Sequence, residues 1–230
     1  MAAPLSIIIP TLNAGSVLPK TLLALMEGLD AGVIREVIIA DGGSTDNSFD
    51  MSDAAGCIWL PSPKGRGAQL RHGAERARGD WLFFLHADTE LSSGWSDAML
   101  NHVSAQNTAA YCRLAFRSKH PFARVVAGWA NLRSRIFGLP YGDQALLVPR
   151  RLYDALGGYA AVPLMEDVMI ARALKGRLIA LPITATTDAS RYEEEGWLRR
   201  GAKNLTILLR FLCGANPKDL VTGYERINRR

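Results

Sequence analysis

Residues 36–46 read Glu-Val-Ile-Ile-Ala-Asp-Gly-Gly-Ser-Thr-Asp. The apolar residues within Glu36–Ala40 are continuous, and a carboxylate and two glycines follow them. A short continuous run rich in β-branched residues predicts a strand that is buried on both faces. The residues after it predict a tight turn, with Ser44 or Thr45 as the cap of a helix over Asp46–Ala55. A strand, a turn and a helix in this order are typical of a parallel α/β sheet.

The same alternation continues on both sides of this unit. Helical spacing of apolar residues predicts the helices, and short apolar runs predict the strands. In the first half we expect strands over Leu5–Ile9, Cys57–Leu60 and Trp81–Leu85, and helices over Ser16–Leu29 and Arg66–Ala77. In the second half we expect strands over Ala109–Phe116, Ala145–Val148 and Leu178–Leu181, and helices over Ser93–Ser104, Pro121–Phe137, Val168–Leu174 and Glu193–Leu212. The chain is therefore predicted to be one α/β domain, doubly wound in its first half and mixed in its second.

The composition is that of an ordinary globular protein. The chain has 230 residues, 48% of them hydrophobic, and a formal net charge of +5. No apolar run approaches the roughly 20 residues that a membrane span needs, and no charged segment followed by an apolar one opens the chain. We therefore expect no secretory signal and a cytoplasmic protein, which also suits three widely spaced cysteines. The positive charge predicts an anionic partner: nucleic acid, a membrane surface or a phosphorylated small molecule.

Polar residues follow all four strands of the first half. In an open α/β sheet, ligands bind beyond the carboxyl ends of the strands, so these residues should line one crevice. Two ends carry carboxylates and one carries cations, which suits a phosphorylated ligand with a divalent metal. Each group taken alone is also consistent with a turn, a helix cap, a solvated loop or, for His86, a core histidine. The four groups are Pro10-Thr11-Leu12-Asn13, Asp41–Asp46, Pro63–Gly67 and His86-Ala87-Asp88.

Two common nucleotide sites are absent from this crevice. A dinucleotide fingerprint needs Gly-x-Gly-x-x-Gly after the first strand, where this chain has Pro-Thr-Leu-Asn. A P-loop, Gly-x-x-x-x-Gly-Lys-Ser/Thr, is also absent. A Gly-rich loop with an arginine after the first strand, usual in nucleotidyltransferases, is missing as well, which counts against that class.

Several motifs resemble those of the family-2 glycosyltransferases with the GT-A fold. These motifs are Ser6–Asn13, Glu36–Asp46, Phe84–Asp88, Gly142–Gln144 and Leu164–Asp167, and the resemblance runs from about Leu5 to Arg191. Within the family, the chain looks most like a small bacterial subgroup, the arsenosugar-biosynthesis glycosyltransferases. The resemblance implies a nucleotide-binding half over 1–90, an acceptor-side half over 91–192 and a C-terminal helical appendage over 193–230.

The resemblance also implies a role for each site residue. Asp167 would be the general base, with Glu166 beside it, and Asp88 would hold Mg²⁺ or Mn²⁺ against the donor diphosphate. His86 stands where the family usually has the first acid of the metal motif, so Asp88 would be the one carboxylate on the metal. The nucleotide sugar would contact Pro10, Thr11, Asn13, Asp41, Gly43, Lys64, Arg66, Ala87 and Asp88. The acceptor or donor-sugar side would include Gly142, Asp143, Gln144 and Arg191.

The implied activity is an inverting, metal-dependent transfer of a sugar from a UDP- or GDP-type donor to an unknown acceptor hydroxyl, on a small molecule or a lipid. The residue types suit it, because a divalent ion stabilises a leaving phosphate and a carboxylate can deprotonate a hydroxyl. One base without a second catalytic carboxylate on the opposite face predicts single displacement with inversion. Two alternatives stay open: a non-catalytic nucleotide-sugar or lipid-phosphate binding protein, and a sugar nucleotidyltransferase.

Two basic, apolar stretches occupy the second half. Residues Arg113–Arg135 carry six Lys or Arg and no acid, and Trp197–Leu212 has a similar character. Basic amphipathic helices can lie on anionic membranes, or their apolar faces can pack on the sheet. We expect packing for Trp197–Leu212 and leave both possibilities open for Arg113–Arg135. Nucleic-acid binding is not expected, because none of the usual recognition motifs is present.

Overall fold

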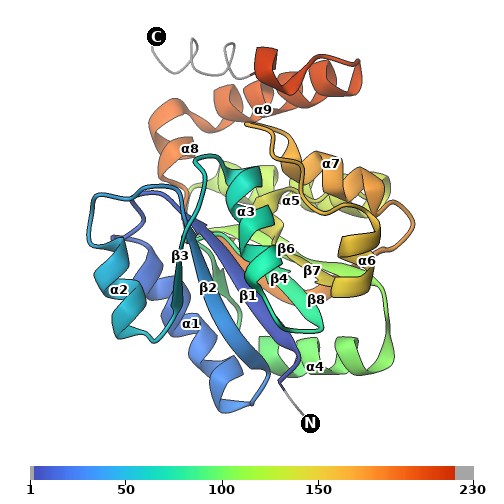
Figure 1. The fold of residues 1–230 in the computed structure, drawn as a ribbon. Coiled ribbons are helices and arrows are strands. Elements are labelled where there is room, and N and C mark those ends of the chain that lie inside the picture. The colour runs from blue at the N-terminus through green and yellow to red at the C-terminus, as the bar shows by residue number, and fades with distance from the viewer. Residues whose placement is uncertain (1–2, 221–230) are drawn as a thin grey trace.

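The computed structural model describes residues 3–220, which form one sheet with helices on both faces (Figure 1). The strands are β1 (Leu5–Thr11), β2 (Ile34–Asp41), β3 (Ile58–Pro61), β4 (Trp81–Phe84), β5 (Glu90–Leu91), β6 (Ala109–Phe116), β7 (Leu146–Pro149) and β8 (Leu178–Thr187). The helices are α1 (Leu18–Asp30), α2 (Ser48–Ala54), α3 (Arg66–Arg76), α4 (Trp95–Ala105), α5 (Pro121–Phe137), α6 (Arg150–Ala155), α7 (Glu166–Ala173), α8 (Ser190–Glu195) and α9 (Trp197–Leu212), with a 3₁₀ turn η1 (Gly142–Gln144).

The strand order within the described residues is β3-β2-β1-β4-β7-β6-β8-β5. Strands β1, β2, β3 and β4 are parallel neighbours, with Ile7 of β1 opposite Val37 on one side and Phe83 on the other. Strand β7 is antiparallel to both β4 and β6, and β8 is parallel to β6. The predicted α/β class, with a doubly wound first half and a mixed second half, is confirmed. The parallel strands bring their carboxyl ends to the upper edge in Figure 1.

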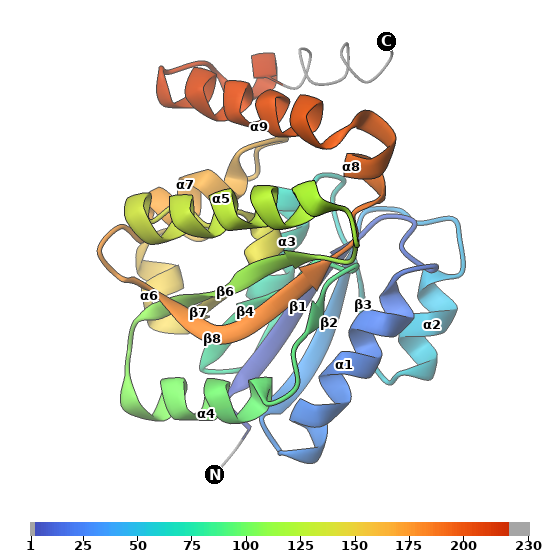
Figure 2. The same ribbon diagram turned by 180° about the vertical axis from the view of Figure 1, so that it is seen from behind.

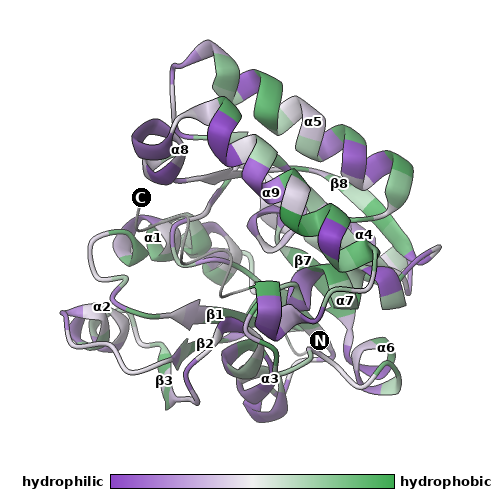
Figure 3. Cartoon of the chain, turned by 90° about the horizontal axis from the view of Figure 1, so that it is seen from above, coloured by the Kyte–Doolittle hydropathy of each residue, from purple (hydrophilic) through white to green (hydrophobic). Residues whose placement is uncertain are grey.

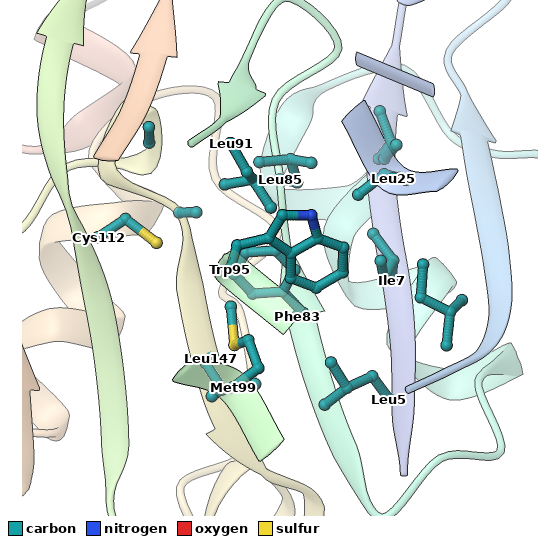
Figure 4. Packing of buried hydrophobic residues seen from close by; sticks show 14 of the residues in the cluster. Leu5, Ile7, Leu25, Phe83, Leu85, Leu91, Trp95, Met99, Cys112 and Leu147 are labelled. Atoms are coloured by element: carbon teal, nitrogen blue, oxygen red, sulfur yellow. The ribbon is translucent and has the colours of Figure 1, made fainter. Parts of the chain in front are cut away.

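Both faces of the sheet are covered, which explains the continuous apolar strands. On one face, alternate residues of β1 and β4 pack against α1 and α4, and Trp95 lies fully buried at the centre of this cluster (Figure 4). On the other face, Ile8 and its neighbours pack against α3, α6 and α7. Gly73 of α3 lies so close to the sheet that an added Cβ would stand 2.4 Å from Ile8 Cγ2.

The upper edge of the sheet is covered by elements from the second half of the chain. Helix α5 packs on β6, and α8 and α9 pass above the strand ends beside it (Figure 2). The predicted bounds of α5 are confirmed, since Pro121 stands at the first helical position and Gly138 ends the helix in a left-handed conformation. In residues 3–220, no helix has both the length and the apolar character that crossing a membrane requires.

Three expectations about local structure were wrong, and two elements were missed. The predicted helix over Glu193–Leu212 is two helices, because Gly196 adopts a φ of 86° between α8 and α9. Helix α2 begins at Ser48 instead of Asp46, and its N-cap residue is Asn47 instead of Ser44 or Thr45. The Asp46 carboxylate accepts a hydrogen bond from Ser48 N just before the helix. Strand β8 extends to Thr187, beyond the predicted end. Strand β5 and helix α6 were not predicted at all.

Candidate active site

A cleft of about 830 Å³ opens at the carboxyl ends of β1 and β4, below α8 and α9. This is the place where ligands bind in open α/β sheets. Three of the four predicted strand ends meet there, together with residues from α7, α8 and α9. The predicted site residues that line it are Pro10, Thr11, Asn13, Lys64, Arg66, Ala87, Asp88, Gly142, Asp143, Asp167 and Arg191.

Asp41 lies beside the cleft and fixes the shape of its floor. It is buried, and its Oδ2 accepts hydrogen bonds of 2.8 Å from both Gly43 N and Ser44 N. Its Oδ1 accepts one from Thr11 Oγ1 at 3.1 Å. The loop is also tied to the first strand end, because Asn13 Oδ1 accepts a hydrogen bond from Thr45 N. Neither Asp41 nor Gly43 is among the residues that line the cleft, so their predicted contacts with a nucleotide sugar stay predictions.

Gln144 was predicted on the acceptor side, and the structure places it in the interior instead. Its side chain is fully buried and accepts a hydrogen bond from Ser134 Oγ. Its Nε2 donates to Cys112 O. Gln144 therefore anchors η1 to β6 and α5, and positions Gly142 and Asp143 on the cleft wall without lining the cleft itself.

A buried cluster of charges stands at the N-terminus of α7. Glu166 is 1% exposed and forms a salt bridge with Arg66, whose Nη2 also lies 3.7 Å from Asp167 Oδ2. Burial raises the pKa of Glu166, and the Arg66 guanidinium opposes this shift. Asp167 is held by two backbone donors, Gly142 N at 3.0 Å and Val168 N at 2.8 Å. The Glu166 carboxylate is therefore paired with Arg66, and Asp167 is the acid of the two that lines the cleft.

Three buried polar atoms near the cleft have no hydrogen-bond partner. They are His86 Nε2, Asp143 Oδ1 and Glu166 Oε2. Burial, assisted by the Arg66 charge, lowers the pKa of His86 from 6.5 to about 4, so the imidazole is neutral at pH 7. Burial raises the pKa of Asp143 from 3.8 to about 6. Unpartnered polar atoms at such positions are typical of sites that are completed by a ligand.

The residues at the end of β4 fit a divalent cation only in part. Asp88 supplies a carboxylate, whose Oδ1 accepts a hydrogen bond from Thr187 Oγ1 at 3.2 Å. A neutral His86 can supply the lone pair of its unpartnered Nε2 as a second ligand. Within residues 3–220, no group of three or more His, Cys, Asp or Glu side chains is placed to hold a metal ion. A cation there would need further oxygen ligands, which a diphosphate can supply.

Several residues of the cleft were missed from the sequence. Gln69 of α3 donates to Thr11 O at 2.6 Å and to Ala40 O at 2.7 Å, and so ties two strand ends together. Tyr141 stacks under the Arg133 guanidinium, 3.5 Å from its ring centroid. No motif marks these residues, because each reaches the cleft through tertiary packing. Further missed residues include Thr187, Asp188, Tyr192, Glu194, Arg200, Asn204 and Ile207, so the predicted appendage also lines the cleft.

Backbone strain is concentrated around this cleft. In residues 3–220, the non-glycine residues with positive φ are Asn13, Ala145 and Met165, at 52°, 51° and 69°. Asn13 and Met165 line the cleft, and Ala145 directly follows the 3₁₀ turn that carries Asp143. Such conformations cost about 1–3 kcal/mol each and are frequent at functional sites.

Asp143→Asn is expected to stabilise the protein at pH 7, by on the order of 2 kcal/mol. The folded-state pKa of Asp143 is raised, so its carboxyl destabilises the fold as the pH rises through about 6. The advantage of the variant should therefore be full above pH 7 and disappear below pH 4. Thermal unfolding across this range measures it, and an equal advantage at pH 4 and pH 8 would show that desolvation of the carboxylate is not the cause.

Comparison with known proteins identifies the family of this chain. The model of the family described as Glycosyl transferase family 2 matches residues 6–161, more than half of the chain. A PGL/p-HBAD biosynthesis glycosyltransferase of Mycobacterium bovis is 36% identical over 99 residues, 40% of this chain and 38% of the relative. An uncharacterized glycosyltransferase of Haemophilus influenzae is 28% identical over 106 residues, 43% of this chain and 42% of that one. The matches thus span about two fifths of each relative.

Solved structures show the same fold at low identity. TarS of S. aureus in complex with UDP-GlcNAc superposes with a TM-score of 0.62 at 13% identity, over 80% of this chain and 58% of TarS. Glucosyl-3-phosphoglycerate synthase of Mycobacterium tuberculosis, in complex with Mn²⁺, UDP and phosphoglyceric acid, gives 0.62 at 16% identity, over 93% and 79%. The architecture is therefore that of GT-A glycosyltransferases, as predicted. On the family match, the chain belongs to glycosyltransferase family 2.

Proposed function

We propose that this protein transfers a sugar from a nucleoside-diphosphate sugar, of UDP or GDP type, to the hydroxyl of an acceptor, with inversion at the anomeric carbon. The observation that carries the proposal is that one cleft contains both Asp88, at the end of β4, and Asp167, at the start of α7. Complexes of two structural neighbours with UDP support a UDP-type donor. The resemblance to the arsenosugar-biosynthesis subgroup stays a prediction.

The donor diphosphate would lie between Asp88 and the cations of the α3 loop. Mg²⁺ or Mn²⁺, held by Asp88 and His86, would stabilise the negative charge that develops on the leaving diphosphate. Lys64 and Arg66 line the same cleft and would add positive charge. A neutral His86 suits this role, because an imidazole binds a metal only in its unprotonated form.

Asp167 would take the proton of the acceptor hydroxyl. Its carboxylate already accepts hydrogen bonds from Gly142 N and Val168 N, which fix its orientation. Arg66 Nη2 lies 3.7 Å from Asp167 Oδ2 and places a positive charge beside this carboxylate. The Glu166 carboxylate is held by Arg66 and buried, which leaves Asp167 as the base. Attack on the side of the ring opposite the diphosphate then inverts the sugar, which NMR of the product's anomeric configuration would test.

Asp88→Asn is expected to weaken UDP binding in the presence of Mn²⁺ by roughly tenfold or more, because one anionic oxygen ligand of the cation is lost. Binding without metal should stay within about twofold, since asparagine keeps the hydrogen bond from Thr187. Titration calorimetry with UDP, with and without Mn²⁺, measures both. Asp50→Asn, at an exposed position on α2, is the control. Equal loss with and without Mn²⁺ would remove Asp88 from the metal site.

A further inference from the structure

Helices α5 and α9 together expose an unusual amount of apolar surface. Ten of the sixteen large hydrophobic side chains exposed within residues 3–220 lie on these two helices. The helices run side by side above the strand ends, and apolar residues recur along both (Figure 3). We call this surface the α5–α9 face. It consists of Phe122, Val125, Trp129, Leu132, Ile136, Phe137, Leu198, Leu205, Leu209 and Leu212.

Helix α5 has the opposite distribution of apolar side chains from an ordinary surface helix. Its inward side carries mostly small residues: Ala123, Ala127, Ala130 and Ser134 are buried against the protein, together with Arg133. Its outward side carries large apolar residues three and four positions apart, among them Trp129 at 49% and Ile136 at 62% exposure. A surface helix normally turns its large apolar side chains inward. The outward stripe therefore indicates an apolar partner outside this chain.

The α5–α9 face is also free of acid and rich in cations. The sequence has no acidic residue between Asp97 and Asp143, and none between Glu195 and Asp219. Arginines 124, 135, 199 and 210 are exposed on the two helices, and none has a carboxylate partner within residues 3–220. A second copy of this chain would bring these like charges together, which disfavours self-association. An anionic surface would be complementary to them.

We infer that the α5–α9 face rests on the surface of a bilayer that contains anionic lipid. Large apolar side chains enter the headgroup boundary and the arginines contact lipid phosphates, as in interfacial amphipathic helices. A groove of about 460 Å³ between Phe122 and Leu198 opens at the end of this face, and Arg199 and the acidic Glu193 of α8 also line it. The opposite side of α9 lines the cleft through Arg200, Asn204 and Ile207. The contact thus holds the cleft close to the membrane surface, whatever sugar the enzyme transfers.

Binding to vesicles tests this inference without nucleotide. The full chain should co-sediment with phosphatidylcholine vesicles that contain about 30% phosphatidylglycerol, and bind pure phosphatidylcholine roughly tenfold more weakly. About 0.5 M NaCl should weaken binding to the anionic vesicles, because it screens the arginines. Brominated lipids should quench the wild type more than Trp129→Phe, a variant that keeps an apolar residue at the face.

Matched variants test whether vesicle binding depends on this face or on charge and exposed apolar residues elsewhere on the protein. Trp129→Ser/Ile136→Ser and R124E/R135E should each lose binding by roughly tenfold or more. The controls L23S/M26S, which remove exposed apolar residues of α1, and R35E/R151E, which make the same charge change elsewhere, should bind like the wild type. All eight substituted positions are exposed, and an unchanged UDP affinity confirms folding.

Three results would overturn the inference. One is that R35E/R151E loses as much vesicle binding as R124E/R135E, which would mean that attraction to anionic lipid does not depend on this face. Another is failure of the folded wild type to bind anionic vesicles. The third is a dimer in sedimentation analysis that dissociates in Trp129→Ser/Ile136→Ser, which would assign the face to a second copy. None of these results bears on sugar transfer, since the assays contain no donor.

Discussion

Asp167→Asn is expected to lower kcat for sugar transfer by about 10²- to 10⁴-fold, the range contributed by a positioned general base. Asparagine can still accept the hydrogen bond from Gly142 N, so the wall of the cleft should keep its shape. It cannot take a proton from the acceptor. Release of UDP from a UDP-sugar measures the effect, and hydrolysis by water can stand in for transfer because water must also be deprotonated.

Binding measurements decide whether the loss belongs to the chemical step. The affinity for UDP with Mn²⁺ should stay within about twofold of the wild type, because Asp167 acts on the acceptor and not on the donor. Asp154→Asn, at an exposed position of α6, is the matched control and should be fully active. If Asp167→Asn kept its kcat, or lost UDP binding in parallel with activity, its role as the base would be refuted.

Arg66→Met is expected to lower the free energy of unfolding by about 3 kcal/mol, because it leaves the Glu166 carboxylate buried without its partner. For a chain of this size, the loss corresponds to a fall in Tm of roughly 6–12 °C. The pKa of Glu166 is already raised by burial and should rise further. A carboxyl with a raised folded-state pKa destabilises the fold at the pH values where it must ionise. The loss of unfolding free energy in Arg66→Met should therefore be smaller at pH 5 than at pH 8.

A second substitution isolates the cause. Adding Glu166→Gln to Arg66→Met removes the unpaired charge and should restore a large part of the lost stability, as a double-mutant cycle followed by thermal unfolding would show. Glu75→Gln, which removes the exposed partner of Arg71 on α3, is the control and should change stability little. If the double variant were no more stable than Arg66→Met, the buried pair would not be what Arg66 stabilises.

The central strands could be predicted because each is a continuous apolar run, and a run of this kind is buried wherever it lies in a covered sheet. Strand β5 could not be predicted, since two residues carry no pattern and pair with Thr186 and Ala185 only after the chain has folded. The break at Gly196 escaped prediction for a similar reason. Glycine permits a positive φ but does not require it.

The residues of the site also fall into those that the sequence predicted and those that it did not. Residues directly after strands, such as Asp88, were predicted because parallel topology sends strand ends to one edge. Gln69 and Tyr192 were missed, since they reach the cleft from α3 and α8 through packing. Gln144 was misplaced, because a motif gives a position along the chain and not the direction in which its side chain points. The structure turns it inward, onto Ser134.

The sequence by itself determined the order of the longer strands and most helices and the acidic and basic groups at the strand ends, because both follow from local pattern. Only the tertiary structure decided which side of α5 is buried. Its sequence contains small and large apolar residues on different sides, and either could pack inward. Close approach to β6 selects the alanines, so the large residues, with Trp129 among them, face outward. Burial depends on what lies opposite a residue, and a single sequence does not record that.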